Sequence, residues 1–246
     1  MPDDNATKVK ICGTTRLQDA ELAVQLGAWA IGMIFYDASP RSCSLIEAEA
    51  ISRALRRKVE LCGVFVNGSL ETITAIAEQL HLSIIQLHGD EGQAFCNEVA
   101  RRTGAKVCKA VQIAAAGDVR ALEGFHVDFH LVDGKGKAGQ RGGTGQTFDW
   151  SLLRARRGGR LATPLILSGG LNPDNVAAAI EAVKPFAVDV ASGVEQAPGR
   201  KDEMRLRDFF AAVEGVGADT SPAAEQPAAP SAGTDATKGA DAEVPA

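Results

Sequence analysis

Short apolar runs rich in valine and isoleucine recur along the chain, separated by segments with the hydrophobic spacing of amphipathic helices. In chain order the runs are KVKICG at 8, AIGMIFY at 30, ELCGVFV at 60, SIIQLHG at 83, KVCKAVQI at 106, DFHLVDG at 128, TPLILSGG at 163 and FAVDVASG at 186. Segments such as LQDAELAVQLG and LETITAIAEQL lie in the gaps. This alternation predicts repeated βα units and therefore eight parallel strands.

Eight parallel strands close either as an open doubly wound sheet or as a (β/α)8 barrel. The first turn lacks G-x-G-x-x-G, and glycines or reactive residues follow nearly every strand at its carboxyl end, where a barrel builds its site. We therefore predict an α/β fold, a single (β/α)8 TIM barrel over residues 8–215, after a flexible N-terminal arm at 1–7. Residues 216–246 are rich in alanine, proline and acidic residues and predict a disordered tail, which is either a solvated extension or a segment with its own role.

Composition narrows the range of partners. The 246 residues are 45% apolar and 23% charged, with a formal net charge of -5. Most of that charge lies in residues 217–246, so the predicted barrel is nearly neutral and no basic run favours a nucleic-acid partner. The N-terminus has no apolar signal region, and no segment approaches the roughly 18 apolar residues of a membrane helix. We expect a cytoplasmic protein, without membrane association, that acts on a small molecule.

The cysteine pattern predicts reduced thiols and no metal. Cys12, Cys43, Cys62, Cys96 and Cys108 contain no CxxC pair, and no histidine stands at zinc-ligand spacing from them. A free cysteine is most often a small buried apolar residue. We expect four of the five to be of this kind, which leaves one to explain.

The exception is the cysteine at the end of the first strand. Side chains alternate along a strand, so Lys10 and Cys12 share a face that points into the barrel while Ile11 meets the helices. A nearby ammonium lowers the pKa of a thiol from about 8.5 and favours the thiolate. Cys12 is therefore a candidate base, with a buried inert thiol as the alternative.

A carboxyl group ends the sixth strand. Asp133 in FHLVDG shares a face with Leu131 and follows the apolar Val132. Partial shielding from water favours the neutral form of a carboxyl group, which can then donate a proton. Asp133 is a candidate general acid; the alternative is an aspartate that caps the next turn.

Glycine-rich turns follow the last three strands as GQRGGTGQ, LSGGLNP and ASGVEQAPG. Glycine lets backbone amides approach an oxyanion closely, and barrels often bind phosphate after strands seven and eight. Tight turns alone would also explain each glycine, but three in one sector favour a ligand. The predicted phosphate-binding residues are Gly142, Gly143, Gly169, Gly170, Ser192 and Gly193.

Other polar positions lie close to these strand ends. Asp189 in AVDVASG points inward near the phosphate turn, where it either hydrogen-bonds within the loop or contacts substrate. Arg41 in ASPRSCS follows the second strand and suits a bidentate pair with a substrate carboxylate, unless it is a surface arginine. Gln86 and His88 share one face of the fourth strand, and an isolated histidine there is more often structural.

Seven ordered motifs carry a family resemblance: KICGTT, FYDASPRS, GVFVNG, IQLHGDE, LVDGK with GGTGQTFDW, LSGGLNPDNV and VDVASGVEQAPGRKD. Together they strongly resemble phosphoribosylanthranilate isomerase, from Lys8 to Phe210. The resemblance implies conversion of N-(5-phosphoribosyl)anthranilate to 1-(2-carboxyphenylamino)-1-deoxyribulose 5-phosphate in tryptophan biosynthesis. The implied partner is this small phosphorylated anthranilate, and no cofactor or metal is implied.

The resemblance also assigns roles to residues. The family's KICG cysteine is the general base and its LVD aspartate the general acid, which correspond to Cys12 and Asp133 here. Arg41 matches the arginine near the anthranilate carboxylate, and the glycine turns match the phosphate site. The family commonly has DVSSG where this chain has Ala191 before Ser192, so one hydroxyl is missing.

Two other functions fit the same barrel. A related sugar isomerase of histidine biosynthesis is expected to use two aspartates, one in the position that Cys12 fills. A phosphate-binding scaffold with a retired site would not need both Cys12 and Asp133. The sequence leaves the oligomeric state open between monomer and homodimer.

Overall fold

The computed structural model describes residues 6–134, 149–153 and 163–218. In this part eight parallel strands close into a barrel in which each pairs with its neighbours in sequence and β8 returns to β1. The strands are β1 (Lys8–Ile11), β2 (Ala30–Phe35), β3 (Glu60–Phe65), β4 (Ile84–Leu87), β5 (Lys106–Ile113), β6 (Phe129–Gly134), β7 (Leu165–Leu167) and β8 (Ala187–Val190). The predicted barrel is confirmed, and the open sheet is excluded.

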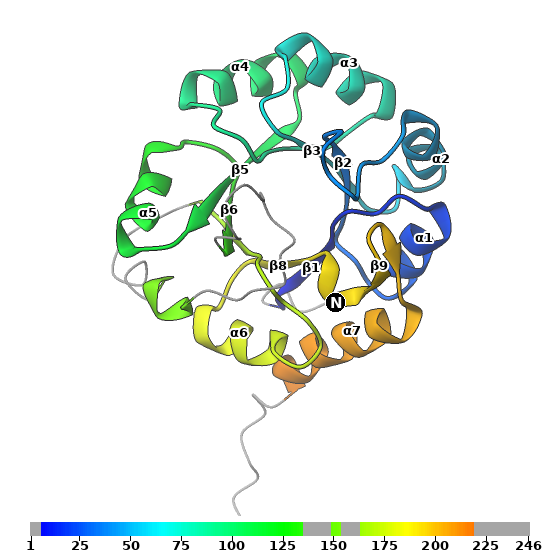
Figure 1. Ribbon diagram of the computed structural model, residues 1–246, viewed down its shortest axis with the longest axis vertical. Helices are drawn as coiled ribbons and strands as arrows, with labels where there is room; N and C mark the ends of the chain where they lie inside the picture. Colours follow the sequence, from blue (N-terminus) through cyan, green and yellow to red (C-terminus); the bar gives the residue numbers. More distant parts are fainter. Residues whose placement is uncertain (1–5, 135–148, 154–162, 219–246) are drawn as a thin grey trace, which may run out of the picture.

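Helices form a ring around the strands (Figure 1). Those in the described residues are α1 (Leu17–Gln25), α2 (Leu45–Leu55), α3 (Leu70–Leu80), α4 (Gln93–Thr103), α5 (Ala116–Ala121), α6 (Val176–Val183) and α7 (Glu203–Ala218). Ser44 begins α2 with a capping box that includes Glu47. Helix α7 continues to Ala218, past the boundary at 215 that the change in composition suggested. Residues 219–246 of the predicted tail and 1–5 of the arm lie outside the described residues.

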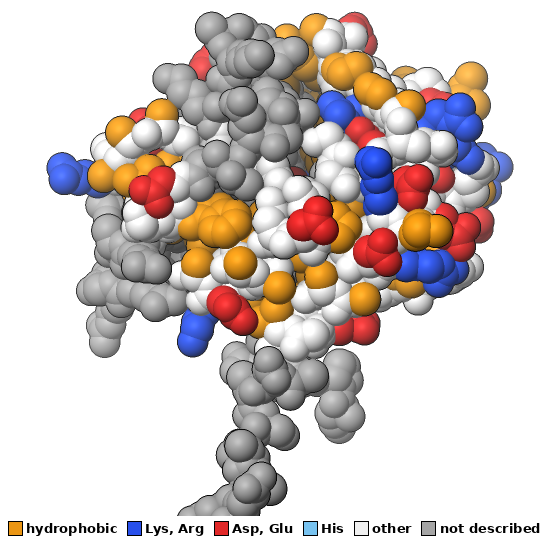
Figure 2. Space-filling model, turned by 60° about the horizontal axis from the view of Figure 1, so that its bottom comes forward, with side chains coloured by type: hydrophobic (Ala, Val, Ile, Leu, Met, Phe, Trp, Pro, Cys, Tyr) orange, Lys and Arg blue, Asp and Glu red, His pale blue; other side chains and the backbone are white. Residues whose placement is uncertain are grey.

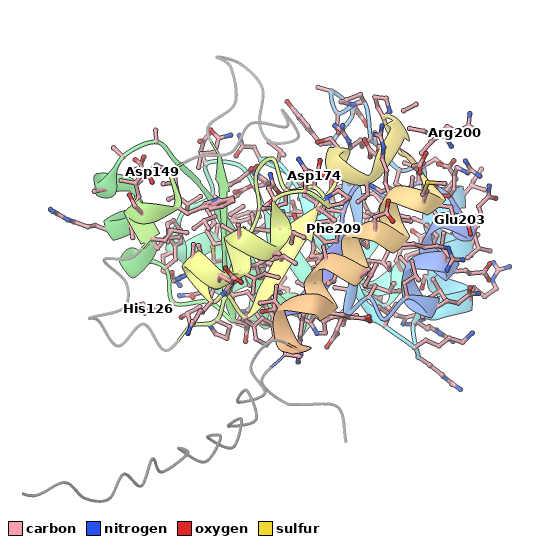
Figure 3. The ribbon with its side chains drawn as sticks, turned by 90° about the horizontal axis from the view of Figure 1, so that it is seen from below. His126, Asp149, Asp174, Arg200, Glu203 and Phe209 are labelled. Carbon is pink, nitrogen blue, oxygen red and sulfur yellow. The ribbon has the colours of Figure 1, made fainter. Side chains whose placement is uncertain are left out.

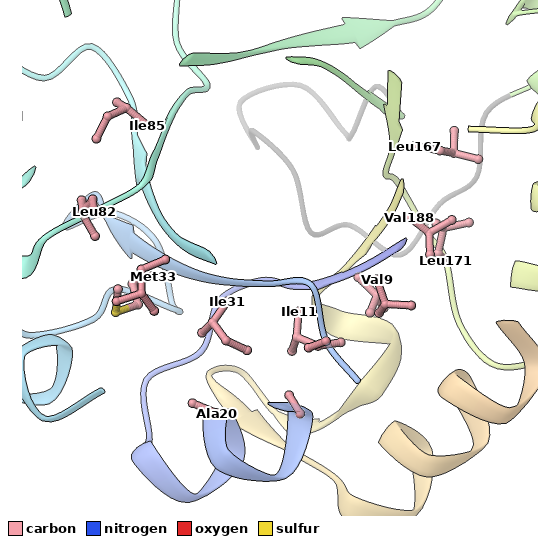
Figure 4. Packing of buried hydrophobic residues seen from close by; sticks show 14 of the residues in the cluster. Val9, Ile11, Ala20, Ile31, Met33, Leu82, Ile85, Leu167, Leu171 and Val188 are labelled. Carbon is pink, nitrogen blue, oxygen red and sulfur yellow. The ribbon is translucent and has the colours of Figure 1, made fainter. Parts of the chain in front are cut away.

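Aliphatic side chains fill the space between the strands and the helices. Ile11 and Ile31 point from the strands toward α1, which carries Ala20, and Val9 belongs to the same buried cluster (Figure 4). A second, smaller cluster lies inside the barrel and includes Cys12. The predicted alternation, with Ile11 outward and its neighbours inward, is confirmed.

The two ends of the barrel carry different residues. At the amino-terminal ends of the strands, which we call the floor, the rings of Trp29, Phe129 and Phe186 pack with centroids 5.2–5.5 Å apart. We call the carboxyl-terminal ends of the strands the mouth. Asp174, which follows β7, and Arg200, which follows β8, lie toward the mouth, whereas His126, which precedes β6, lies toward the floor (Figure 3).

A short hairpin follows β8 and packs between α1 and α7 (Figure 1). Strand β9 (Glu195–Ala197) pairs antiparallel with β10 (Arg200–Lys201) around a Pro-Gly turn. Gly199 takes the positive φ of 76° that the third position of a type II turn requires. The Thr15 hydroxyl donates to the Gly199 carbonyl at 2.7 Å and fastens the hairpin to the segment after β1.

The described surface is mixed in charge on the face that Figure 2 presents. Acidic and basic side chains are interspersed there with apolar ones, and no broad basic area is visible among the described residues (Figure 2). Within the described ranges, no helix combines the length and apolar composition needed to cross a membrane.

Candidate active site

Cys12 follows β1 and its side chain lies inside the mouth of the barrel. Its backbone N–H donates to Val190 of β8 at 2.9 Å, and the side chain packs with the interior residues Cys62 and Cys108. A Cβ added to Gly32 of β2 would lie 2.9 Å from the Cys12 sulfur, so that glycine leaves room for the thiol. The predicted inward orientation of Cys12 is confirmed.

A buried ion pair lies next to the thiol. Lys10 Nζ donates to Asp189 Oδ1 at 2.7 Å, and Ser168 Oγ donates to the other carboxylate oxygen at 3.1 Å. Both charged side chains are almost fully buried. The hydrogen bonds of Asp189 therefore run to β1 and to the residue after β7, and not within its own loop as one of the sequence alternatives had it.

Burial raises the pKa of the Cys12 thiol. The Lys10 ammonium lowers this pKa, the Asp189 carboxylate raises it and the Lys201 ammonium lowers it, but the loss of hydration outweighs the two cations. The expectation that Lys10 favours the thiolate is right for the sign of its own effect. The net pKa of Cys12 is nevertheless raised, because burial has the largest effect.

Asp133 is the penultimate residue of β6, and its side chain is buried. A Cβ added to Gly169, which follows β7, would lie 2.9 Å from Asp133 Oδ1 and would collide with the Gly134 nitrogen. Gly169 has a positive φ of 92°, so both its backbone and its lack of a side chain permit this close approach. The turn after β7 thus shields the carboxyl group from water.

His88, which follows β4, faces Asp133. Its Nε2 lies 3.6 Å from Asp133 Oδ2, and its Nδ1 lies 3.1 Å from the side-chain amide nitrogen of Gln86. Because an amide nitrogen donates, Nδ1 accepts and the ring proton lies on Nε2, toward the carboxyl group. The sequence favoured a structural role for this histidine; the structure brings it to the candidate acid.

Arg41, after β2, is held beside the end of β1. Its Nε donates to both carboxylate oxygens of Glu195 at 3.0 and 2.9 Å, and its Nη2 lies 2.9 Å from Oε2. A Cβ on Gly13 would lie 2.7 Å from Arg41 Cδ, so the arginine stem passes directly over the residue after Cys12. The guanidinium keeps further N–H groups on Nη1.

The turns after β7 and β8 touch each other. A Cβ on Gly193 would collide with the Leu171 carbonyl oxygen. Gly170 has a φ of 67°, and its carbonyl accepts from Asn175 Nδ2 at 2.9 Å. Ser192 begins a single 3₁₀ turn, Ser192–Val194. Gly142 and Gly143 lie outside the described residues.

Sequence reasoning did not single out Glu195 and Lys201. The two residues pair across the hairpin, and Lys201 Nζ lies 2.9 Å from Glu195 Oε1. Their signal was present in GVEQAPGRKD, where a Pro-Gly turn lies between an acid and a base. In the part of the chain that is described, no three histidine, cysteine or acidic side chains gather as a metal ion would require.

Comparison with known proteins decides the family. The sequence profile described as N-(5'phosphoribosyl)anthranilate (PRA) isomerase matches residues 9–212. The chain belongs to the N-(5'-phosphoribosyl)anthranilate isomerase family. A curated family member from Citrifermentans bemidjiense is 43% identical over 211 residues, which are 85% of this chain and 98% of that protein. One from Geobacter sulfurreducens is 42% identical, with the same two coverages.

Solved structures agree with this assignment. Phosphoribosyl anthranilate isomerase from Thermotoga maritima is 44% identical, with a TM-score of 0.76 over 85% of this chain and 99% of that chain. A structure of phosphoribosyl anthranilate isomerase in complex with reduced 1-(o-carboxyphenylamino)-1-deoxyribulose 5-phosphate is 42% identical with a TM-score of 0.73, covering 85% of this chain and 99% of that chain.

Proposed function

We propose that this isomerase of tryptophan biosynthesis uses Cys12 as its general base and Asp133 as its general acid on N-(5'-phosphoribosyl)anthranilate. The family supplies the reaction, and the described residues supply a thiol and a carboxyl group at the mouth of one barrel. The reaction moves protons and needs one group to donate and one to accept. These two side chains are suited to the two roles.

Asp133 acts first. It transfers its proton to the ring oxygen of the ribose, the bond between that oxygen and C1 breaks, and the nitrogen lone pair forms a C=N bond. The product is an open-chain iminium ion next to a carboxylate. His88 Nε2 lies 3.6 Å from Asp133 Oδ2, so a small movement of either side chain would let it donate to that carboxylate once the proton has left.

Cys12 acts second, as the thiolate. The iminium charge acidifies the hydrogen on C2, the sulfur takes that proton, and the bonding electrons form C1=C2 while the C=N π electrons return to nitrogen. The resulting enolamine then relaxes to the aminoketone by protonation at C1 and loss of the hydroxyl proton. The ammonium groups of Lys10 and Lys201 near the sulfur favour the thiolate that this step requires.

The phosphate of the substrate binds the turns after β7 and β8. Gly169, Gly170, Ser192 and Gly193 supply backbone amides in two turns that touch each other. Gly142 and Gly143 complete the proposed set from outside the described residues. Asp189, whose two oxygens already hold Lys10 and Ser168, contributes by keeping the ammonium beside the thiol.

The carboxylate of the anthranilate ring pairs with Arg41. Glu195 accepts from one edge of this guanidinium, which leaves the Nη1 side for an incoming carboxylate. The arginine stem crosses the residue after Cys12, so the aryl end of the substrate would lie near the base. This pairing selects an aryl carboxylate over a neutral ring.

The proposed acid, the proposed phosphate turns and the proposed base are linked by direct contacts. In a chain of this family, the turn after β7 contacts Asp133 through Gly169 and contacts the turn after β8 through Gly193. The end of β8 in turn pairs with the end of β1, which Cys12 follows. Acid, phosphate turns and base therefore form one continuous surface.

The activity is tested by following the fluorescence of phosphoribosylanthranilate after addition of the purified full chain. We expect the signal to fall at a rate proportional to protein concentration. The substrate of the histidine-pathway isomerase serves as the control and should not be consumed. An unchanged anthranilate signal, or turnover of the histidine-pathway substrate alone, would contradict the proposal.

A further inference from the structure

Lys201 is a buried lysine whose part in the proposed reaction is so far only the effect of its charge on the Cys12 thiol. Its side chain is fully buried, and its ammonium donates to three acceptors. These are the carbonyl of Cys12 at 2.6 Å, the carbonyl of Ala191 at 3.1 Å and Oε1 of Glu195 at 2.9 Å. An ammonium has three N–H donors, so every donor of Lys201 has a partner.

The choice of acceptors separates Lys201 from an ordinary buried ion pair. Burying an ammonium is expensive, and buried pairs are often no more stabilising than apolar residues of similar size. Stability alone therefore does not explain why a lysine stands here. Each acceptor belongs to or adjoins a group that contacts substrate in the proposed function. Cys12 is the base, Ala191 precedes Ser192 of the phosphate turn, and Glu195 binds Arg41.

The hairpin that carries Lys201 is hydrogen-bonded to two helices. Its backbone N–H donates to Asp19 Oδ2 at 3.0 Å, which ties β10 to α1. Glu195 is held from the other side, since its carbonyl accepts from Arg205 Nη1 of α7 at 2.6 Å. The hairpin thus presents Lys201 and Glu195 from a position anchored on two helices.

We propose that Lys201 is a positioning residue. It holds the end of β1 at Cys12, the turn after β8 at Ala191 and, through Glu195, the Arg41 guanidinium in fixed positions relative to one another. This inference rests on the proposed function. Lys201 touches no reacting atom; it acts on the residues that do. Glu195 is the intermediate member, because it accepts from Lys201 and from Arg41 with the same carboxylate.

The surroundings of the thiol define a readout that a purely structural lysine would not move. The titratable or charged groups around Cys12 are Lys10 on β1, Cys62 on β3, Cys108 on β5, Asp189 on β8 and Lys201 on β10, with Glu195 and Arg41 next to Lys201. Lys201 lowers the pKa of Cys12. Its removal should therefore shift thiol ionisation to higher pH.

The first test compares Lys201→Met with Lys109→Met. Lys109 is a matched control: it is buried on β5 and donates to a carboxylate, Glu91, and to a carbonyl, Gly89, each at 2.7 Å. We measure alkylation of Cys12 by a haloacetamide against pH, located by mass spectrometry. We expect the profile to move to higher pH in Lys201→Met and to stay in place in Lys109→Met. An unmoved profile in Lys201→Met, or equal shifts in both variants, would overturn the proposal.

Turnover supplies the second readout. We expect kcat of Lys201→Met to fall on the order of ten- to a hundredfold, because a displacement of about 1 Å is enough for such a loss. Lys201→Arg keeps the charge but not the shape, so its alkylation profile should stay at the wild-type pH while kcat falls. Wild-type kcat in Lys201→Arg would overturn the proposal. Should Lys201→Met fail to fold, Lys201→Arg is the decisive variant.

The link through Glu195 is tested by a double-mutant cycle. Glu195→Gln should raise the KM for the anthranilate substrate in the wild-type background and should have little further effect in Arg41→Met, because it acts on substrate through that arginine. Additive effects would overturn the link. The alkylation experiment needs no substrate, so a wild-type protein without turnover would refute the proposed function and leave the positioning of Cys12 by Lys201 separately measurable.

Discussion

The floor and the mouth of this barrel are built by the same strands but contain opposite chemistry. At the floor, Trp29, Phe129 and Phe186 pack ring against ring. At the mouth, Lys10 with Asp189 and Lys201 with Glu195 are buried as ion pairs. Aromatic burial stabilises a fold, whereas buried ion pairs contribute little net stability. The comparison indicates that stability is concentrated at one end and chemistry at the other.

The largest expected effect is on stability, at the floor. Phe129→Ala removes a buried ring in contact with both Trp29 and Phe186, and should lower the free energy of unfolding by about 3–5 kcal/mol. At temperatures where the variant is still folded, kcat should stay near the wild-type value. Urea denaturation and turnover of the same sample measure both. A large loss of kcat in the folded variant would break the separation between floor and mouth.

The next largest effect is on kcat and compares two glycines with positive φ, Gly169 at the mouth and Gly104 away from it. Gly169→Ala introduces a side chain at positive φ and against Asp133, and we expect kcat to fall about a hundredfold. Gly104→Ala also introduces a side chain at positive φ, but nothing lies within 4 Å of its new Cβ. Gly104→Ala should lose about 1–3 kcal/mol of stability from backbone strain, and Gly169→Ala should lose more, because its Cβ also collides with the Gly134 nitrogen. Equal kcat values in the two variants would contradict the close approach of Gly169 to Asp133.

The pH at which the Cys12 thiol ionises tests the electrostatics of the mouth. Burial raises the pKa of Cys12, so alkylation of this thiol should rise with pH and reach its midpoint above the ordinary cysteine value of about 8.5. The charge of Asp189 also raises this pKa, so Asp189→Asn should move the midpoint to lower pH. A midpoint below the ordinary value in the wild type, or a shift to higher pH in Asp189→Asn, would refute this electrostatic account.

The smallest effect concerns the phosphate turn. Ala191→Ser restores the hydroxyl that the family commonly has, and one added hydrogen bond to a charged group contributes about 1.5 kcal/mol or somewhat more. A hydroxyl that reaches the phosphate should therefore lower KM by about tenfold or somewhat more, while kcat stays the same. Steady-state kinetics measure this, and a raised KM would show that the position does not favour a hydroxyl.

Strand order and side-chain direction were predictable because they depend on local periodicity. The alternation in KVKICG placed Cys12 inward and Ile11 outward, and both orientations are found. The same reasoning placed Asp133 on the face of Leu131, inside the barrel. These results need only the period of a strand and the closure of the sheet.

Contacts between distant segments were not predictable in the same way. Lys201 and Cys12 are separated by 189 positions and meet only because β8 closes on β1 and a hairpin folds back over the junction. The net pKa shift of Cys12 depends on distances that decide between burial and two ammonium groups. His88, after β4, meets Asp133 of β6 past the intervening β5, and a single histidine without a spacing motif gives no signal of that approach.

If Cys12 and Asp133 carry the protons, replacing either one should abolish turnover without abolishing binding, so both quantities are measured on the same variants. Cys12→Ser and Asp133→Asn are assayed by the loss of phosphoribosylanthranilate fluorescence, and their affinity for the reduced product analogue is measured by calorimetry. We expect turnover to fall about a hundred- to ten-thousand-fold in each variant while the affinity stays close to that of the wild type. Full turnover in either variant would contradict it.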